Sequence, residues 1–259
     1  MMDAIELFTL SILPVFLVLD RVLRRSAQRE IAGWRWRAGT VSVAMFLFVG
    51  QIGDLASALI GELRLIDGSG LGTFEGAVIG VLVYELLHYW YHRAVHRSDR
   101  LWRFVGHQMH HSAERIDAFG AYFGHPLDLA LFTSIAVFVL YALLGLSPSA
   151  AGAAAAFLAF NAVFQHADIA TPRWLGFLIQ RPESHRIHHG RGTHGFNYSD
   201  LPLWDALFGT LSNPPPGADS EVGFYDGASA RVGEMLVGRD VSKPPVGKAT
   251  QAVLSTLGG

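Results

Sequence analysis

Three short stretches of this chain concentrate histidine at spacings of three and four residues. One is an HxxxH box and two are HxxHH boxes; random placement of 12 histidines in 259 residues would produce about 0.03 copies of HxxHH. The boxed residues are His92, His96, His107, His110, His111, His185, His188 and His189. Residues three or four apart share one side of a helix, so each box is expected to point its imidazoles into one space. Neutral imidazole is the commonest metal ligand at physiological pH, and the boxes therefore predict a metal site.

The number of imidazoles indicates more than one ion. Structural zinc takes four ligands and catalytic zinc takes three protein ligands, fewer than the boxes offer. The chain has no cysteine, which excludes thiolate zinc sites and cysteine-ligated iron–sulfur clusters. Carboxylate-rich di-iron bundles use two ExxH motifs, and here only Glu85 to His88 has that form near a box. The pattern favours two ions held by imidazole, and spacing alone leaves zinc, copper, iron and nickel open.

Four histidines lie outside the boxes. His125 immediately precedes a proline, and His166 ends the last long apolar stretch, so both are included among the predicted metal ligands. His88 lies one helical turn before the first box, deeper toward the predicted membrane, and His194 lies between glycines in an expected loop. Whether these last two bind metal stays open, and His194 is expected beside the ligands or at the surface.

The composition indicates a membrane protein. Hydrophobic residues make up 51% of the chain and charged residues 16%, with a mean hydropathy of +0.30. Five apolar stretches approach the length of about 20 residues that a membrane helix needs; they span roughly 4–20, 40–60, 72–92, 127–146 and 149–167. The predicted fold is an all-α, integral-membrane bundle of about five apolar helices. A large soluble bundle is the alternative, and a formal net charge of -2 argues against nucleic acid as a partner.

Positive charge alternates along the segments that connect these stretches. The segment after the first stretch carries Arg21, Arg24, Arg25, Arg29, Arg35 and Arg37, and the segment 93–126 carries Arg93, Arg97, Arg100, Arg103 and Arg115. The segment after the second stretch has only Arg64, and the turn near 147 has no basic residue. Because cytoplasmic loops collect Lys and Arg, the boxes are expected in a histidine-rich helical cap on the cytoplasmic face. The N-terminus is then expected outside.

At this point the residues resemble the fatty acid hydroxylase/sterol desaturase superfamily of integral-membrane di-iron oxygenases. All three boxes occur in the family's order, and the match runs from about 72 to 212. The pairs His125–Pro126, Gln165–His166 and Asn197–Tyr198 and the segment Trp204–Thr210, WDALFGT, also resemble family features. The chain departs from the family at Glu85, where an Asp is common, and at His88, where an aromatic residue is usual.

The resemblance implies two iron ions, O2 as co-substrate and attack on an unactivated C–H bond of a lipid. Hydroxylation is the first interpretation. A lipid or sterol desaturase on the same scaffold is the alternative, and a histidine-rich membrane metal transporter is a third. The lipid is not identified. Electrons are expected from a separate donor, of ferredoxin or cytochrome type with a reductase, and the membrane would be the bacterial inner membrane, or the endoplasmic reticulum in a eukaryote.

The chain divides accordingly into three parts. Residues 1–71 are expected to form N-terminal membrane helices and a basic loop, residues 72–212 the di-iron domain, and residues 213–259 an irregular tail with one short helix near 232–237. Each ligating imidazole should donate its second N–H to a carboxylate, a carbonyl or water. The candidate carboxylates are Glu85, Glu114, Asp117, Asp128, Asp168, Glu183 and Asp205.

Overall fold

The computed structural model describes residues 3–23, 28–60, 62–216, 218 and 220–245. Within these ranges the chain is helical and forms no strand, apart from an isolated bridge between Gly190 and Val222. The all-α prediction is therefore confirmed for the described residues. Arg24 and Arg25 of the predicted basic loop, and residues 246–259 of the predicted tail, lie outside them.

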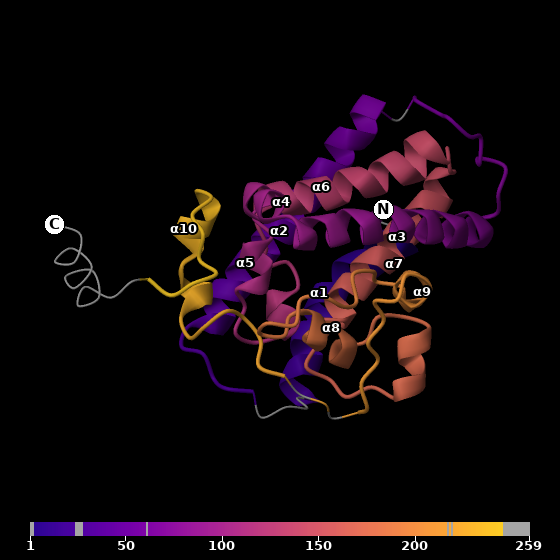
Figure 1. The fold of residues 1–259 in the computed structure, drawn as a ribbon. Coiled ribbons are helices and arrows are strands. Elements are labelled where there is room, and N and C mark those ends of the chain that lie inside the picture. The colour runs from indigo at the N-terminus through magenta and orange to yellow at the C-terminus, as the bar shows by residue number, and fades with distance from the viewer. Residues whose placement is uncertain (1–2, 24–27, 61, 217, 219, 246–259) are drawn as a thin grey trace, which may run out of the picture.

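Long helices occupy all five predicted apolar stretches (Figure 1). They are α1 (Ala4–Val22), α2 (Trp34–Ile60), α3 (Thr73–Arg97), α6 (Pro126–Val137) with its π-helical continuation η2 (Phe138–Leu143), and α7 (Pro148–Phe164). Helix α3 extends five residues beyond the predicted 72–92, so that both histidines of the first box lie on one helix. It ends at Ser98, whose side chain accepts from the Leu101 N–H and starts the next helix.

Hydrogen bonds between the termini of different helices show which termini lie at the same end of the bundle. At one end, the Leu65 and Gly68 N–H groups donate to the carbonyls of Ala142 and Leu144, at 2.8 and 2.9 Å. At the other end, the Asp20 carboxylate accepts from the main-chain N–H groups of Ala118 and Asp168, which follow the first two boxes and α7. Successive long helices therefore run in opposite directions, and the histidines lie together at the second end, here called the histidine end.

Small residues allow α3 to approach its neighbours closely. A Cβ atom at Gly76 would lie 2.8 Å from the Ala150 Cβ, and one at Gly80 would lie 2.6 Å from the Leu140 Cδ2. Glycines four residues apart on one face are a common device for close helix packing in membranes. This contact brings the polar residues of α3 and α7 toward each other.

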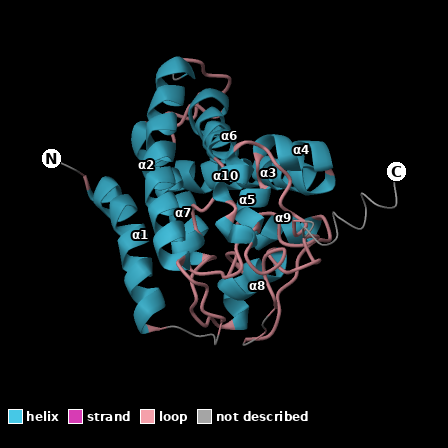
Figure 2. Ribbon diagram, turned by 90° about the vertical axis from the view of Figure 1, so that its left-hand side faces the viewer, coloured by secondary structure: helices cyan, strands magenta, loops and turns pink. Residues whose placement is uncertain are grey.

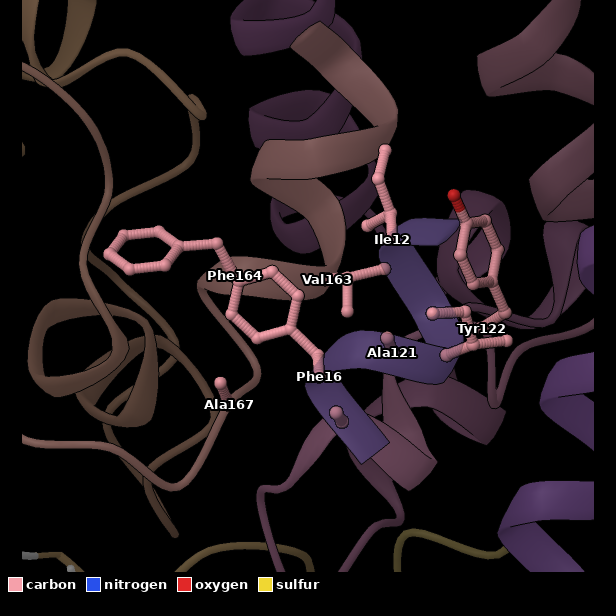
Figure 3. Packing of buried hydrophobic residues seen from close by; sticks show 9 residues of the cluster. Ile12, Phe16, Ala121, Tyr122, Val163, Phe164 and Ala167 are labelled. Carbon is pink, nitrogen blue, oxygen red and sulfur yellow. The ribbon is translucent and has the colours of Figure 1, made fainter. Parts of the chain in front are cut away.

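A separate apolar cluster fixes α1 against α7 and the loop after the second box (Figure 3). Ile12 and Phe16 of α1 pack with Val163 and Phe164 of α7 and with Tyr122. The Phe16 ring lies 6.2 Å from the Phe164 ring in an edge-on contact, a favoured aromatic geometry. Helix α1 therefore packs against the end of α7, just before His166, and holds it in position.

Short helices and loops form the histidine end (Figure 2). They include α4 (Asp99–Val105), α5 (Gln108–His111), η1 (Ala118–Gly120), η3 (Arg173–Phe177), α8 (Pro182–His188), α9 (Pro202–Leu207), η4 (Ala228–Ala230) and α10 (Val232–Leu236). The short helix expected near 232–237 is thus present. The described part of the tail packs on α5, because the Gln108 side chain bonds both the Arg239 carbonyl and the Val241 N–H, at 2.8 and 3.0 Å.

Two helical stretches are long and apolar enough to cross a membrane, Trp34–Ile60 and Pro126–Leu143. No residue of the most apolar window of α2 is buried within the protein, and Leu47 and Leu59 are 56% and 75% exposed. An apolar surface of this extent is unfavourable in water and favourable in lipid. The structure thus supports membrane association, and the number of crossings stays a prediction.

Candidate metal centre

The boxed histidines and His166 converge in two groups at the histidine end, and all of them are buried except the partly exposed His96 and His110. The first group consists of His92, His96, His107, His111 and His188, and the second of His110, His166, His185 and His189. Within each group, one side-chain nitrogen from every residue lies within 4.8 Å of the others. The structure therefore brings together nine of the ten predicted ligands.

Each HxxHH box serves both groups, which differs from the expectation of one common space. In α5 and the residue before it, His107 and His111 belong to the first group and His110 to the second. Residues four apart on a helix differ by about 40° around its axis, whereas the middle histidine of the box, three residues after the first, points about 60° to the other side. One helical turn can thus place ligands on two neighbouring ions.

Local sequence signals turn the chain between the boxes. Gly106 ends α4 with a φ of 80°, and a Cβ atom there would lie 2.4 Å from the His125 ring. This left-handed position, favourable for glycine, lets α5 begin directly after α4 and faces its histidines toward α3. Pro182 starts α8 at a position where a proline costs no hydrogen bond, so the third box also occupies a short helix.

In the first group, unprotonated nitrogens face one another. The His92 and His107 Nε2 atoms are 3.0 Å apart, and the His96 Nε2 lies 3.2 Å from both. His92 donates its Nδ1–H to the Tyr198 carbonyl at 2.7 Å, and His107 donates to Asp128 at 2.7 Å. A neutral ring that donates from Nδ1 carries its lone pair on Nε2. These lone pairs repel one another unless a cation lies between them.

The second group repeats this arrangement. The His185 Nε2 lies 3.0 Å from the Nε2 atoms of both His166 and His189, and His166 lies 3.2 Å from His110. His166 donates its Nδ1–H to the Ala162 carbonyl at 2.7 Å, one turn earlier on α7. The tautomer that this bond selects again directs a lone pair toward the centre of the group.

Burial favours the neutral form of most of these imidazoles. It lowers the pKa of His111, His185, His188 and His189 well below the usual 6.5, and neighbouring imidazoles lower it further. Both ring nitrogens of His111 and the Nε2 of His188 are buried without a hydrogen-bond partner. Neutral imidazole is the form that binds a metal, and buried polar atoms without partners are rare unless a ligand satisfies them.

His125 lies outside both groups. Its Nδ1 accepts from the Leu127 N–H at 3.2 Å, which caps α6, and its Nε2 lies 3.4 Å from the Leu236 carbonyl. The proline that follows it was a signal for this role, because a cap residue followed by a proline commonly starts a helix. The geometry thus gives His125 a structural partner at each nitrogen.

The two histidines left open have different surroundings. The His194 ring lies 4.9 Å from the His111 ring and its Nδ1 lies 3.2 Å from the His188 carbonyl. Burial lowers the pKa of His194. His88 instead lies 3.3 Å from Glu85 and belongs to a third buried group, with Glu85 and Asp200.

Of the seven candidate carboxylates, Asp128 bonds a grouped histidine and Glu85 bonds His88. The other five form hydrogen bonds with residues outside the two groups: Glu114 with Gly227 and Ser229, Asp117 with Trp34 and Arg115, Asp168 with Arg115 and Arg186, Glu183 with Thr171, and Asp205 with Tyr198 and Ser199. Burial raises the pKa of Asp117 and Asp205. These carboxylates hold the loops that carry the histidines.

Main-chain carbonyls orient four of the other grouped rings, those of His92, His110, His166 and His188, and sequence reasoning did not identify them. Asn197 has a φ of 58°, and this turn presents the Phe196 carbonyl to His188 at 2.8 Å and the Tyr198 carbonyl to His92. The Asn197 side chain stabilises the turn through the Ser184 and Ser212 carbonyls. The Asn-Tyr pair was the available signal, because asparagine tolerates the left-handed conformation.

A cavity of about 490 Å³ reaches the first group from outside. Its lining includes His96 and His194, the aromatic rings of Trp102 and Phe224, and the basic side chains of Arg103 and Arg191. No member of the second group is among its lining residues. A molecule from outside can therefore approach the first group through His96.

Comparison with known proteins agrees with this site. The family model described as fatty acid hydroxylase matches residues 77–210. The chain is similar to the alkylglycerol monooxygenase of Homo sapiens, at 33% identity over 54% of this chain and 30% of that protein, and to the ornithine lipid hydroxylase of Rhizobium tropici, at 30% identity over 57% and 45%. A sphinganine C4-monooxygenase of Arabidopsis thaliana is 25% identical over 66% and 64%. The alignments thus span less than half of the first two relatives, and no solved structure matches the chain.

Proposed function

The chain belongs to the fatty acid hydroxylase family, and we propose that it is a membrane-bound di-iron oxygenase that uses O2 and electrons to hydroxylate a C–H bond of a lipid. The observation that carries the proposal is the pair of adjoining groups of neutral imidazoles whose lone pairs converge. The relatives named above are monooxygenases and a hydroxylase, which supports oxidation of a lipid over other uses of such a site.

The residues fit two ions. Five nitrogens of the first group and four of the second exceed the needs of one ion, and the two groups adjoin where the His111 and His189 rings stack at 4.3 Å. An all-imidazole donor set suits iron as well as zinc and copper. Family membership favours iron among these, and the adjoining groups would hold the two ions side by side.

Bound iron would supply the electron transfer and C–H cleavage, and the chain would supply orientation and a dry site. Asp128 and the Tyr198 carbonyl hold His107 and His92 with their Nε2 lone pairs directed inward. Burial of both groups excludes water, which protects reactive species and keeps the imidazoles neutral. The cavity lined by His96 is the proposed approach for small molecules.

The lipid substrate and the membrane belong to the same proposal. The exposed apolar surface of α2 would face acyl chains, so that a lipid could reach the histidine end from within the bilayer. We place this end on the cytoplasmic side of a multi-pass protein, in the bacterial inner membrane or the endoplasmic reticulum. A separate ferredoxin or cytochrome with a reductase would deliver the electrons. A tag near residue 218 should then be accessible from the cytoplasm; accessibility from the opposite side only would contradict this placement.

Metal analysis combined with lipid profiling tests the function. The purified chain should hold two iron ions and, with O2 and a reductant, convert a membrane lipid into a product with one added oxygen atom. Cells with and without the protein should differ by the same product. A product that has lost two hydrogens would favour the desaturase alternative. Zinc alone, or metal flux into liposomes without lipid oxidation, would refute the oxygenase and favour transport.

A further inference from the structure

A third polar cluster lies between α3 and α7, next to the first histidine group, where the His88 ring stacks on the His92 ring at 5.4 Å. We call it the Glu85 site; it consists of Glu85, His88, Asn161, Gln165 and Asp200. Ligand atoms of Glu85, His88 and Asp200 lie within 4.8 Å of one another, and all three residues are buried. Ionisable side chains are costly at such a position between apolar helices, and in membrane proteins they usually mark functional sites.

Contacts with Asp200 hold the site together. The Glu85 Oε2 accepts from the Asp200 N–H at 2.8 Å and from the Ser199 hydroxyl at 2.7 Å. From α7, the Asn161 amide donates to the Asp200 carbonyl and the Gln165 amide donates to the Asp200 carboxylate, both at 2.8 Å. Side chains of two long helices and one loop therefore meet at a single residue.

Three oxygens of this site have no partner. The Glu85 Oε1, the Asn161 Oδ1 and the Gln165 Oε1 are all buried without a hydrogen bond. Each belongs to a carboxylate or amide group whose other polar atom already contacts Asp200, so covalent geometry keeps all three beside it. An unsatisfied buried oxygen costs about 1–3 kcal/mol. Three unsatisfied acceptors around Asp200 favour a ligand that carries positive charge.

The charge of the site points the same way. Burial and the neighbouring Glu85 carboxylate both raise the pKa of Asp200, and His88 opposes them less strongly. Two carboxylates thus face each other in an apolar region beside one imidazole. Buried negative charge of this kind is stabilised by a cation with several oxygen ligands.

We propose that the Glu85 site binds one divalent cation in addition to the ions of the two histidine groups. This cation belongs to the class that prefers oxygen ligands, and Mn²⁺ represents the class here. Carboxylate and amide oxygens suit Mg²⁺, Ca²⁺ and Mn²⁺, and the single imidazole favours Mn²⁺ among them. The ion would tie α3 to α7 one turn below His92 and beside His166, and so position both metal-binding helices. It does not depend on the reaction proposed for the histidine groups.

The test is retention of manganese by the purified full chain. Protein loaded first with Fe²⁺ and then with Mn²⁺ is dialysed, and both metals are counted per chain. The wild type should retain one more equivalent of manganese than Glu85→Gln and than Asp200→Asn, while iron stays unchanged. Glu75→Gln, the same substitution at an exposed position of α3, should retain manganese like the wild type. His188→Ala should lose the iron of the first group and keep the manganese.

Equal manganese in the wild type and both variants, or none in the wild type, overturns the proposal and leaves water as the occupant of the site. If Glu85→Gln loses iron as well, the variant has not folded and Asp200→Asn decides, because an asparagine can still accept from Gln165. Absence of iron from the wild type would instead refute the di-iron function and leave the manganese result valid.

Discussion

The two histidine groups use the same side chain but differ in access. In the first group, His96 is partly exposed and lines the cavity of about 490 Å³, beside Trp102. In the second group, no residue lines this cavity, and the rings of His166, His185 and His189 are buried. The cavity therefore leads to the first group and not to the second, although His110 of the second group is also partly exposed.

The anchors of the two groups also differ. His92, His107 and His188 in the first group donate their Nδ1–H to Tyr198, Asp128 and Phe196. Asp128 is a carboxylate that bonds a grouped histidine, and a carboxylate makes its imidazole a stronger donor to metal than a carbonyl does. In the second group, the Nδ1 atoms of His166 and His110 bond main-chain carbonyls, those of Ala162 and Phe123. We infer that the metal of the first group, which faces the cavity, is the one that needs the more strongly donating imidazole ligands.

The largest expected effect separates the groups on one helix. His185 and His188 lie three residues apart on α8 but belong to the second and first group, respectively. Each alanine variant should lose the ion of its own group, because one of four or five ligands is missing, and C–H oxidation should be abolished in both. Metal counting and lipid turnover measure this.

His125→Ala is the matched control for those variants. Its ring caps α6 and contacts neither group, so both ions and most of the activity should remain, with a stability loss of about 1 kcal/mol from the missing cap. A variant that loses an ion here would show that His125 binds metal, as the sequence first indicated.

A smaller effect is expected when the carboxylate anchor is weakened. Asp128→Asn keeps the shape of the side chain but removes its charge, so His107 should hold its metal about 10–100-fold less tightly. Metal titration should show weaker binding of one ion only. Equal weakening of both ions would mean that the two groups act as a single unit.

Chelator extraction tests access directly. Because the first group opens onto the cavity through His96, its ion should leave at a faster rate than the ion of the second group, giving two phases of metal loss. The rates can be followed by removing samples and counting bound metal. A single phase for both ions would contradict the difference in access.

The smallest expected effect concerns the wall of the cavity. Glu114 accepts from the Gly227 N–H and from the Ser229 N–H and hydroxyl, and thereby holds the segment that follows the cavity residue Phe224. Glu114→Gln should cost about 1 kcal/mol and speed only the faster phase of metal loss. The melting temperature and the extraction rates measure the two effects, and a change confined to the slower phase would be evidence against this role.

Much of the long-range organisation was readable from local pattern. Apolar length predicted all five long helices, because a long apolar segment in lipid satisfies its backbone hydrogen bonds by forming a helix. Helical spacing likewise identified eight of the nine histidines that the structure gathers, and the ninth, His166, was predicted from its place at the end of an apolar stretch. The missed features are non-local: the π-helical turn at Phe138–Leu143 and the carbonyls around Asn197 depend on packing between distant segments.

The sequence by itself determined the donor chemistry and the helical scaffold, because the absence of cysteine and the repeated spacing of histidine are properties of the chain alone. The tertiary structure decided how the imidazoles are shared. It divided each HxxHH box between two groups and assigned His125 to a helix cap. It also brought Asp200 to Glu85 and His88, which lie far from it in the sequence. These outcomes depend on which helix faces which, and the angle of a side chain around its helix axis has meaning only once a neighbour is in place.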